Sequence, residues 1–465
     1  MKLLEYVNRA RIDAPAEDVF RWLGRPGAFE RLNPPWQPFR GLSRTGSIES
    51  GGAATVLIPL GMLRLRWMLE HRDFVEGLQF REVQLKGPFA HWSHLTRAEP
   101  DGPDSCFLDN RVEYAMPLGL AGRALVGRLV LRRLKAAFRY RNNTLEQDLK
   151  AHGYYASMPR CKVAVSGASG TIGSNLVHYL TTAGHQVVRL VRDTGLRRDF
   201  QSNKSVIPWD PGRGVLDGSH LEGLDAFVHL SGETIMGRWT PAKKQRMRDS
   251  RVGTARLLAD TLSRLEHPPK VFLCASAVGI YGSAGSDGVM DEDSPAGEGF
   301  LGELAREWEG ACEGAAEAGI RVVHLRLGPV VTPLGGMLKS MLPPFKAGVG
   351  GPVGSGRQYV SWISLDDTLG AIEHCMLTQG IQGPVNITAP EPVTNGELTR
   401  TLGEVLRRPA LLKVPGVALR TALGEMADES LLGSTRAVPG KLLDSGYDFR
   451  HPDIDTALRH VLGRG

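Results

Sequence analysis

A glycine-rich stretch is the part of the sequence whose residue types and spacing most directly predict chemistry. Gly167, Gly170 and Gly173 follow the pattern G-x-x-G-x-x-G, between a short apolar segment and a helical segment over residues 174–183. Glycine allows a sharp turn and lets a phosphate lie against the main chain. The free N–H groups of the following helix attract negative charge. The stretch therefore predicts a loop that binds the pyrophosphate of a dinucleotide; the alternative is a tight turn with no ligand. The loop residues expected to contact the cofactor are Gly167, Ser169, Gly170, Thr171, Ile172 and Gly173.

The end of the next predicted strand, over residues 186–191, indicates which dinucleotide is bound. NAD-binding folds place an acidic residue there, which binds the ribose hydroxyls and repels a 2′-phosphate. This sequence has Val191 at that position, followed by Arg192. Because an arginine fork accommodates a phosphate, Arg192 predicts NADP(H), although Asp193 follows and could restrain the arginine.

The order of predicted elements after residue 160 indicates how these residues are positioned. Strand segments at 162–166, 186–191, 224–233, 271–282 and 321–330 alternate with helices at 174–183, 240–265 and 300–318. This alternation predicts a parallel sheet with helices on both faces, which is the α/β doubly wound Rossmann fold. Leu230, Ser231 and Gly232 end the third strand, and such small residues let a dinucleotide pass over the sheet edge.

Residues 1–152 have a different pattern, which predicts a separate α+β domain joined to the rest by a linker. A strand and a short helix come first, strand-like segments separated by turns follow between residues 54 and 113, and a long helix covers about 121–152. The second domain is predicted over 160–465.

The order of elements in the first domain resembles the START-like helix-grip superfamily, in which a sheet wraps the last helix around a cavity. The resemblance implies a pocket for a hydrophobic ligand. His91, Trp92 and His94 could line that pocket. The alternative is packing in a core, which is the commoner situation of such residues on a strand.

The second domain resembles the extended short-chain dehydrogenase/reductases. The blocks that carry the resemblance are 167–173, 229–232, 276–282, Trp239 with Ser250, Arg251 and Thr254, 354–367, 384–392, Arg408 with Pro409, 424–427 and 446–449. Together they are similar to the atypical, epimerase-like family of NADP-binding reductases with a characteristic C-terminal extension. The resemblance implies an NADP(H) cofactor, Arg251 among its ligands, and a smaller substrate-binding lobe that contains most of 384–465.

The catalytic pair of that family is missing from this sequence. Short-chain reductases use a tyrosine as acid and base, with a lysine four residues later that lowers its pKa. None of the nine tyrosines has a lysine four positions on. Ser276, Tyr281 and Glu233 are the candidate substitutes. Ser276 lies on its predicted strand, near the position of the family's substrate-polarising serine, Tyr281 lies just past that strand at the edge where substrates bind, and Glu233 follows the small-residue loop. The alternative is a packing, buried-hydroxyl or helix-capping role for each of them.

Composition places the chain among ordinary globular proteins. Hydrophobic residues make up 42% and charged residues 23%, and the net charge is +6. Residues 1–158 hold 23 Lys and Arg against 17 Asp and Glu, so this excess of six accounts for the whole net charge. A basic run over 123–141 could bind nucleic acid or anionic lipid, or be the solvated face of a helix; without a groove-reading motif we expect no nucleic-acid partner.

Other features of the sequence predict location and ligands. The five cysteines are scattered with no C-x-x-C, so we expect reduced thiols and no metal site. Neither a signal-peptide core nor a membrane-spanning apolar run is present, which predicts a cytoplasmic protein.

Two functions remain open from the sequence. The first is an NADP(H)-dependent oxidoreductase or epimerase-like enzyme that acts on a small organic substrate. The second is a non-catalytic NADP(H) sensor coupled to a domain that binds a hydrophobic ligand. The cofactor loop fits both functions, and the missing Tyr/Lys pair favours the second.

Overall fold

The computed structural model describes residues 3–37, 39–60, 63–117, 119–192, 205–283 and 288–464. The chain divides into two compact units, and the division in the sequence falls between Pro159 and Arg160. Among the described helices, none combines the length and apolar character needed to cross a membrane.

The first unit is built on one antiparallel sheet. Its elements are β1 (Leu4–Ile12), α1 (Ala16–Gly24), α2 (Ala28–Arg31), β2 (Arg40–Thr45), β3 (Ala53–Leu60), β4 (Leu63–Val75), β5 (Gln79–Lys86), β6 (His91–Pro100), β7 (Cys106–Ala115) and α3 (Gly119–Tyr154). The sheet order is β1-β7-β6-β5-β4-β3-β2, so β1 pairs with the last strand and the others form a meander. The long helix expected over 121–152 is present as α3.

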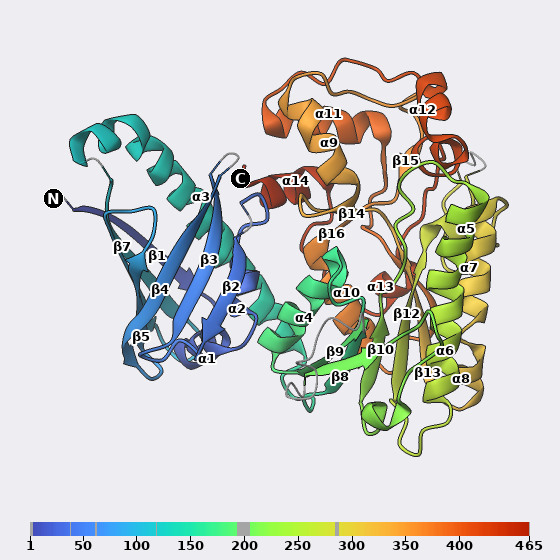
Figure 1. Ribbon diagram of the computed structural model, residues 1–465, viewed down its shortest axis with the longest axis horizontal. Coiled ribbons are helices and arrows are strands. Elements are labelled where there is room, and N and C mark those ends of the chain that lie inside the picture. The colour runs from blue at the N-terminus through green and yellow to red at the C-terminus, as the bar shows by residue number, and fades with distance from the viewer. Residues whose placement is uncertain are drawn as a thin grey trace. The chain divides into compact units, whose positions relative to one another are not determined.

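Helix α3 packs against one face of this sheet (Figure 1). Phe138 of α3 lies in a core with Trp67, Trp92 and Tyr114, and Leu145 lies in a second core with residues of α1 and β7. Along β1, less and more exposed residues alternate, as expected for a strand with one buried face. The hydrophobic stripe of α3 therefore closes the sheet on one side.

The second unit contains the parallel sheet that the sequence predicts. Its strands are β8 (Lys162–Ser166), β9 (Gln186–Arg192), β10 (Val206–Trp209), β11 (Ala226–His229), β12 (Val271–Ala277), β13 (Arg321–Leu327) and β17 (Gly383–Ile387). The order β10-β9-β8-β11-β12-β13-β17 reverses direction between β8 and β11. Such a reversal opens a crevice at the carboxyl ends of the strands, where α/β folds bind nucleotides. The Rossmann-like fold is thus confirmed.

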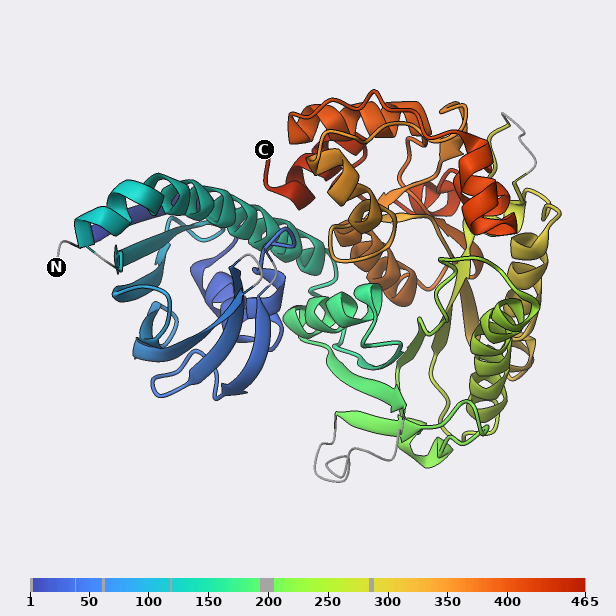
Figure 2. The same ribbon diagram turned by 45° about the horizontal axis from the view of Figure 1, so that its top comes forward.

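Helices cover both faces of this sheet. They include α4 (Thr171–Ala183), η2 (Gly218–Leu221), α5 (Pro241–Arg248), α6 (Thr254–Leu262), η4 (Val278–Tyr281), α7 (Phe300–Gly310), α8 (Glu313–Glu317) and α10 (Leu365–Leu377). Helices α5 to α8 lie on one face, and α4 and α10 on the other (Figures 1 and 2). A π-helical turn, η3 (Asp249–Gly253), interrupts the helix expected over 240–265.

A smaller lobe follows the strands of the main sheet. It contains α9 (Gly336–Lys346), α11 (Asn395–Leu406), α12 (Gly416–Leu423), η5 (Ala427–Leu431), α13 (Gly440–Asp444) and α14 (Ile454–Leu462), with the short strands β14 (Val330–Val331), β15 (Tyr359–Val360), β16 (Ile363–Ser364) and β18 (Val393–Thr394). Leu338, Trp362, Leu402 and Leu458 belong to its core. Strand β17, at the start of the range expected for this lobe, instead extends the main sheet because it pairs with β13.

Candidate cofactor and active site

The glycine-rich loop has the conformation that only glycine adopts easily. Gly167 has a φ of +70°, and a Cβ there would lie 2.7 Å from the main-chain carbonyl of Leu230. A Cβ on Gly173 would lie 2.3 Å from the oxygen of Gly167. These two glycines therefore allow β8, β11 and α4 to approach one another closely.

Gly170 has a different environment from the other two glycines. It is exposed, and the nearest atom to a Cβ at this position would be the Gly167 oxygen at 3.2 Å. The space above the loop is therefore open, and α4 begins at the next residue, Thr171. The first amides of a helix have no intrahelical acceptor, so those of Thr171 and Ile172 are suited to bind a phosphate. The donor set fits the pyrophosphate of a dinucleotide.

A second loop lies beside the first. Leu230, Ser231 and Gly232 follow β11, which pairs with β8, so they meet the glycine-rich loop at the carboxyl edge of the sheet. A Cβ on Gly232 would lie 3.3 Å from Cζ of Arg251. The structure thus places Arg251 against this loop, as expected for a residue predicted to contact the cofactor.

Arg251 has few partners inside the protein. It donates a long hydrogen bond of 3.4 Å to the Met247 carbonyl, and its guanidinium lies 5.2 Å from the ring centre of Trp308. Burial lowers its pKa to about 10, and the charge of Glu233 opposes this. Within the part of the chain that the structure describes, no ion pair is found at Arg251. It is therefore a protonated side chain with free donors beside the predicted cofactor loops.

Arg192 is the last residue of β9 and is exposed. Strand β9 pairs with β8, with Leu190 opposite Ser166, so Arg192 lies at the same carboxyl edge as the glycine-rich loop. This is the position that reads the ribose in dinucleotide-binding folds. Asp193, which was expected to restrain Arg192, lies outside the described residues.

His229 is a residue of this site that the sequence reasoning did not select. It is fully buried at the end of β11, with Nδ1 2.6 Å from the Ser166 hydroxyl and Nε2 3.1 Å from the Thr254 hydroxyl. Burial, with the charge of Arg251, lowers its pKa to about 3, so the ring is neutral at physiological pH. It joins the ends of β8 and β11, which carry the two cofactor loops. The signal in the sequence was a histidine that ends an apolar strand.

Gly335 is a second residue that was missed. A Cβ at Gly335 would lie 2.3 Å from the hydroxyl of Thr171, so this glycine lets the start of α9 approach the start of α4. The smaller lobe therefore reaches the phosphate end of the site, and nothing local in the sequence indicates this contact.

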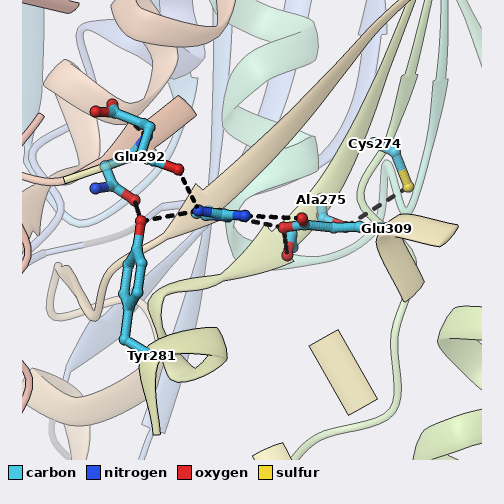
Figure 3. A network of polar contacts seen from close by, with 8 residues as sticks. Cys274, Ala275, Tyr281, Glu292 and Glu309 are labelled. Carbon is cyan, nitrogen blue, oxygen red and sulfur yellow. Dashed lines mark hydrogen bonds and ion pairs between the residues drawn. The ribbon is translucent and has the colours of Figure 1, made fainter. Parts of the chain in front are cut away.

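Two of the three predicted catalytic residues, Ser276 and Tyr281, belong to one buried polar network. The Tyr281 hydroxyl donates to Asn386 Oδ1 at 2.8 Å and accepts from Arg326 Nη1 at 3.0 Å. Arg326 also donates to both oxygens of Glu309, at 2.9 and 3.0 Å. The Ser276 hydroxyl donates to Glu309 at 2.7 Å. Figure 3 shows the network, with Tyr281 at one end and Glu309 at the other.

This network decides what the two hydroxyls can do. Ser276 and Tyr281 are 2% and 6% exposed, and each hydroxyl has a partner inside the protein. Burial raises the pKa of Tyr281, although Arg326 opposes the shift, so the phenol is neutral. A substrate would have to displace Asn386 to receive the tyrosine proton. Their catalytic roles stay predictions, and the contacts explain a structural role directly.

Glu233, the third candidate, has a different environment. Its carboxylate is 38% exposed and accepts from Lys243 Nζ at 2.9 Å. Its backbone N–H donates to the Ser250 hydroxyl, which holds it just after Gly232. The hydrogen bond and charge of Lys243 lower the pKa of Glu233. The accessible group among the three catalytic candidates is therefore a carboxylate, which can accept a proton but holds none to donate at neutral pH.

One group of residues in the described part of the chain has the donor atoms for a metal ion. The ligand atoms of Asp366, His451 and His460 lie within 4.8 Å of one another. His460 Nε2 is 3.1 Å from Asp366 Oδ2, so these two side chains hydrogen-bond directly. Burial lowers the pKa of His451 to about 4. The sequence predicts no metal site, and the direct contact accounts for this cluster.

The three aromatic candidates of the first unit separate in the structure. Trp92 is buried in the core, with its ring centre 5.1 Å from that of Trp67. His94 lines a cavity of about 300 Å³, whereas His91 and Trp92 do not. The packing alternative holds for Trp92, whereas a ligand-binding role for His94 stays a prediction.

Comparison with known proteins identifies the family. The NAD dependent epimerase/dehydratase family matches residues 163–388, and a domain of unknown function (DUF1731) matches 414–461. The epimerase family protein Mb2239 of Mycobacterium bovis is 42% identical over 308 residues, which are 66% of this chain and 99% of that protein. The chain therefore belongs to the NAD dependent epimerase/dehydratase family, and its predicted epimerase-like membership is confirmed.

Solved structures add two points. The human epimerase family protein SDR39U1, solved with NADPH, is 31% identical, with a TM-score of 0.58, and covers 65% of this chain and 99% of its own. The nucleoside-diphosphate sugar epimerase of Corynebacterium glutamicum is 28% identical, with a TM-score of 0.79, over 98% of this chain and 90% of its own. The second match therefore includes nearly all of the first unit as well.

Proposed function

We propose that the second unit binds NADP(H) and acts as an oxidoreductase or epimerase-like enzyme on a small organic substrate. The observation that carries this proposal is the meeting of the glycine-rich loop, the 230–232 loop, Arg192 and Arg251 at one edge of the sheet. The NADPH in the human SDR39U1 structure supports the choice of cofactor.

Each residue has a specific part in this proposal. The amides at the start of α4 bind the pyrophosphate, Arg192 pairs with the 2′-phosphate, and Arg251 adds positive charge beside the 230–232 loop. His229 is a positioning residue, because it joins the two strand ends. The nicotinamide, when bound, supplies or accepts a hydride.

The proton in such a reaction has two candidate sources. Tyr281 is a neutral phenol, so it can donate to a forming alkoxide once a substrate displaces Asn386. Glu233 is a carboxylate and can accept a proton in the reverse direction. With a known substrate, Tyr281→Phe should lower turnover on the order of a hundredfold if Tyr281 is the acid. If Glu233→Gln abolishes turnover and Tyr281→Phe does not affect it, the acid/base is the carboxylate.

Cofactor titration by fluorescence tests the proposal. NADPH should bind about tenfold more tightly than NADH, a difference of roughly 1.4 kcal/mol. Arg192→Ala should remove this difference and leave NADH binding nearly unchanged. Arg256→Ala, an exposed arginine on α6, is the matched control and should change neither affinity. Equal affinities in the unaltered protein would contradict the NADP(H) preference, and no binding of either cofactor would contradict the proposal.

A specific observation favours a second function, a non-catalytic NADP(H) sensor. The hydroxyls of Ser276 and Tyr281 are both engaged inside the protein, and the sequence has no Tyr-x-x-x-Lys pair. Mixing NADPH-loaded protein with a panel of aldehydes and ketones, and following absorbance of the nicotinamide, separates the two functions. Oxidation by any carbonyl compound that Tyr281→Phe or Glu233→Gln slows identifies the enzyme. Tight binding without oxidation favours the sensor.

We further propose that the first unit is a START-like domain that binds an apolar ligand. Its seven-stranded antiparallel sheet, the long C-terminal helix α3 and the cavity of about 300 Å³ support this proposal. None of the five cysteines forms a disulfide, which fits a reducing compartment such as the cytoplasm.

A further inference from the structure

The cavity of the first unit has both an apolar and a polar part. Apolar side chains from α1, α3 and the sheet line it, including Leu23, Ile48, Phe80, Leu108 and Leu145. Its polar lining includes Glu82, His71, His94, Asn110 and Arg141. An apolar cavity with a few convergent polar groups is the usual form of a small-molecule site.

The carboxylate in this cavity already has partners. Glu82 Oε2 lies 2.9 Å from His94 Nδ1, and Glu82 Oε1 lies 3.7 Å from His71 Nε2. The other ring nitrogen of His94 is 3.0 Å from Asn110 Oδ1. Burial opposes ionisation, but the two histidines outweigh it and hold the pKa of Glu82 well below its usual value. Glu82 is therefore an ionised group that is satisfied by its neighbours.

Two arginines line the cavity, of which Arg44 is exposed and Arg141 is partly buried. Arg141 lacks partners such as those of Glu82. Its Nε donates a long hydrogen bond of 3.4 Å to the Leu32 carbonyl, and the guanidinium lies 5.5 Å from the ring centre of Phe138. Among the described residues, no carboxylate lies within 4 Å of it, and its two Nη atoms make no hydrogen bond. Four N–H donors of a charged group thus remain available at the wall of an apolar cavity.

The same unit shows how a buried arginine is normally satisfied. Arg31 donates to both oxygens of Asp148, at 2.8 and 2.7 Å, and both side chains are buried. Asp148 and Arg141 both belong to α3, so the helix supplies a carboxylate to one arginine and leaves the other facing the cavity. An unpaired buried charge costs several kcal/mol unless a partner is provided.

We propose that this cavity binds an amphipathic monocarboxylate, whose carboxylate pairs with Arg141 and whose apolar part packs among Phe80, Leu108 and Leu145. The inference rests on the ligand-binding function proposed above for the first unit. A planar guanidinium fork matches a carboxylate through two parallel hydrogen bonds. The charged side chains of the lining balance, since Glu30 and Glu82 stand against Arg44 and Arg141, so a dianionic phosphate fits less well than a monoanion.

Calorimetric titration of the full chain with decanoate, decan-1-ol and decyl phosphate tests the inference. Decanoate should bind at least tenfold more tightly than either of the others. Arg141→Met should remove this preference by weakening decanoate binding tenfold or more, while the affinity for decan-1-ol stays within about twofold. Arg139→Met is the matched control, since Arg139 is exposed on the same helix, and it should change nothing.

A second variant guards against loss of folding. Arg141→Lys keeps the charge but not the planar guanidinium fork, so it should recover part of the preference for decanoate.

Equal binding of decanoate and decan-1-ol would overturn the inference and leave the proposed ligand-binding function standing. Tighter binding of decyl phosphate would show that the head group is a phosphate and would also overturn it. If none of the three ligands binds, both the inference and the ligand-binding function are contradicted.

Discussion

Two arginines, one in each unit of the protein, differ in their partners; Arg326 is buried, and Arg141 is partly buried at the wall of the cavity. Arg326 donates to both oxygens of Glu309, to the Tyr281 hydroxyl and to the Glu292 carbonyl. Arg141 makes one long hydrogen bond to a carbonyl. Burial opposes the charge in both. For Arg326 the hydrogen bonds and charge of Glu309 outweigh burial and raise the pKa, whereas for Arg141 burial lowers the pKa.

This difference in hydrogen-bond partners distinguishes polar groups that hold the fold together from polar groups that we propose to bind a ligand. Four of the five N–H donors of Arg326 are used within the protein, so it has little left to offer a substrate. Arg141 and Arg251 keep free donors beside a cavity and a cofactor loop. The number of hydrogen-bond partners inside the protein therefore distinguishes structural polar groups from proposed ligand-binding groups better than burial does.

The largest expected effect on stability comes from breaking the buried ion pair between Arg326 and Glu309. Glu309→Gln removes the charge that balances Arg326, and it should destabilise the second unit by about 3–5 kcal/mol, since an uncompensated buried charge remains. The midpoint of urea unfolding measures this. Arg248→Met is the control, because its pair with Glu307 is about one third exposed and should contribute about 1 kcal/mol or less. Similar losses of stability in both variants would contradict the conclusion that the Arg326–Glu309 pair holds the fold together more strongly than the exposed pair does.

Tyr281→Phe should have the next largest effect on stability. It leaves Asn386 Oδ1 and one Arg326 donor without their partner, at a cost of about 1–3 kcal/mol. The affinity for NADPH should stay within about twofold, since the ring remains in place. Tyr154→Phe, at an exposed position, is the control. A Tyr281→Phe protein of unaltered stability would mean that the hydroxyl is not structural.

Arg251→Gln tests the arginine beside the cofactor loops. NADPH and NADH should both bind about tenfold more weakly, roughly 1.4 kcal/mol, because the lost charge faces a part common to both cofactors. Arg192→Ala, in contrast, should weaken only NADPH. Fluorescence titration distinguishes the two patterns. A loss confined to NADPH in Arg251→Gln would place Arg251 at the 2′-phosphate instead.

The smallest effect is expected for Arg141 without its ligand. Arg141→Met should change the stability of the ligand-free protein by about 1 kcal/mol or less, because no internal ion pair is lost and an unpaired buried charge is removed. Arg31→Met should cost about 3–5 kcal/mol, since it removes the arginine that donates to both oxygens of the fully buried Asp148. Equal losses in thermal unfolding would show that Arg141 is part of the fold in the same way as Arg31.

Some residues of the candidate site could be predicted from the sequence, and others could not. The glycine-rich loop, the 230–232 loop and Arg192 could be predicted, because the ends of parallel strands meet at one edge of the sheet whatever the details of packing. Gly335 could not be, because its approach to Thr171 depends on how α9 is placed, far along the chain.

Ser276 and Tyr281 show the limit of reading function from position alone. Ser276 lies near the end of β12 and Tyr281 just past it, as expected, yet their roles depend on partners 33 and 105 residues away, Glu309 and Asn386. The sequence shows that a hydroxyl is present but not which group accepts its proton.

The sequence by itself determined the parallel sheet, the antiparallel unit with its long last helix, and the cofactor loop. Each of these depends on local properties, namely the period of hydrophobic residues and the backbone freedom of glycine. Only the tertiary structure decided that Arg326 is paired while Arg141 faces a cavity. One arginine lies on a strand and the other on a helix, and the difference lies in which carboxylate the folded chain brings within hydrogen-bond distance.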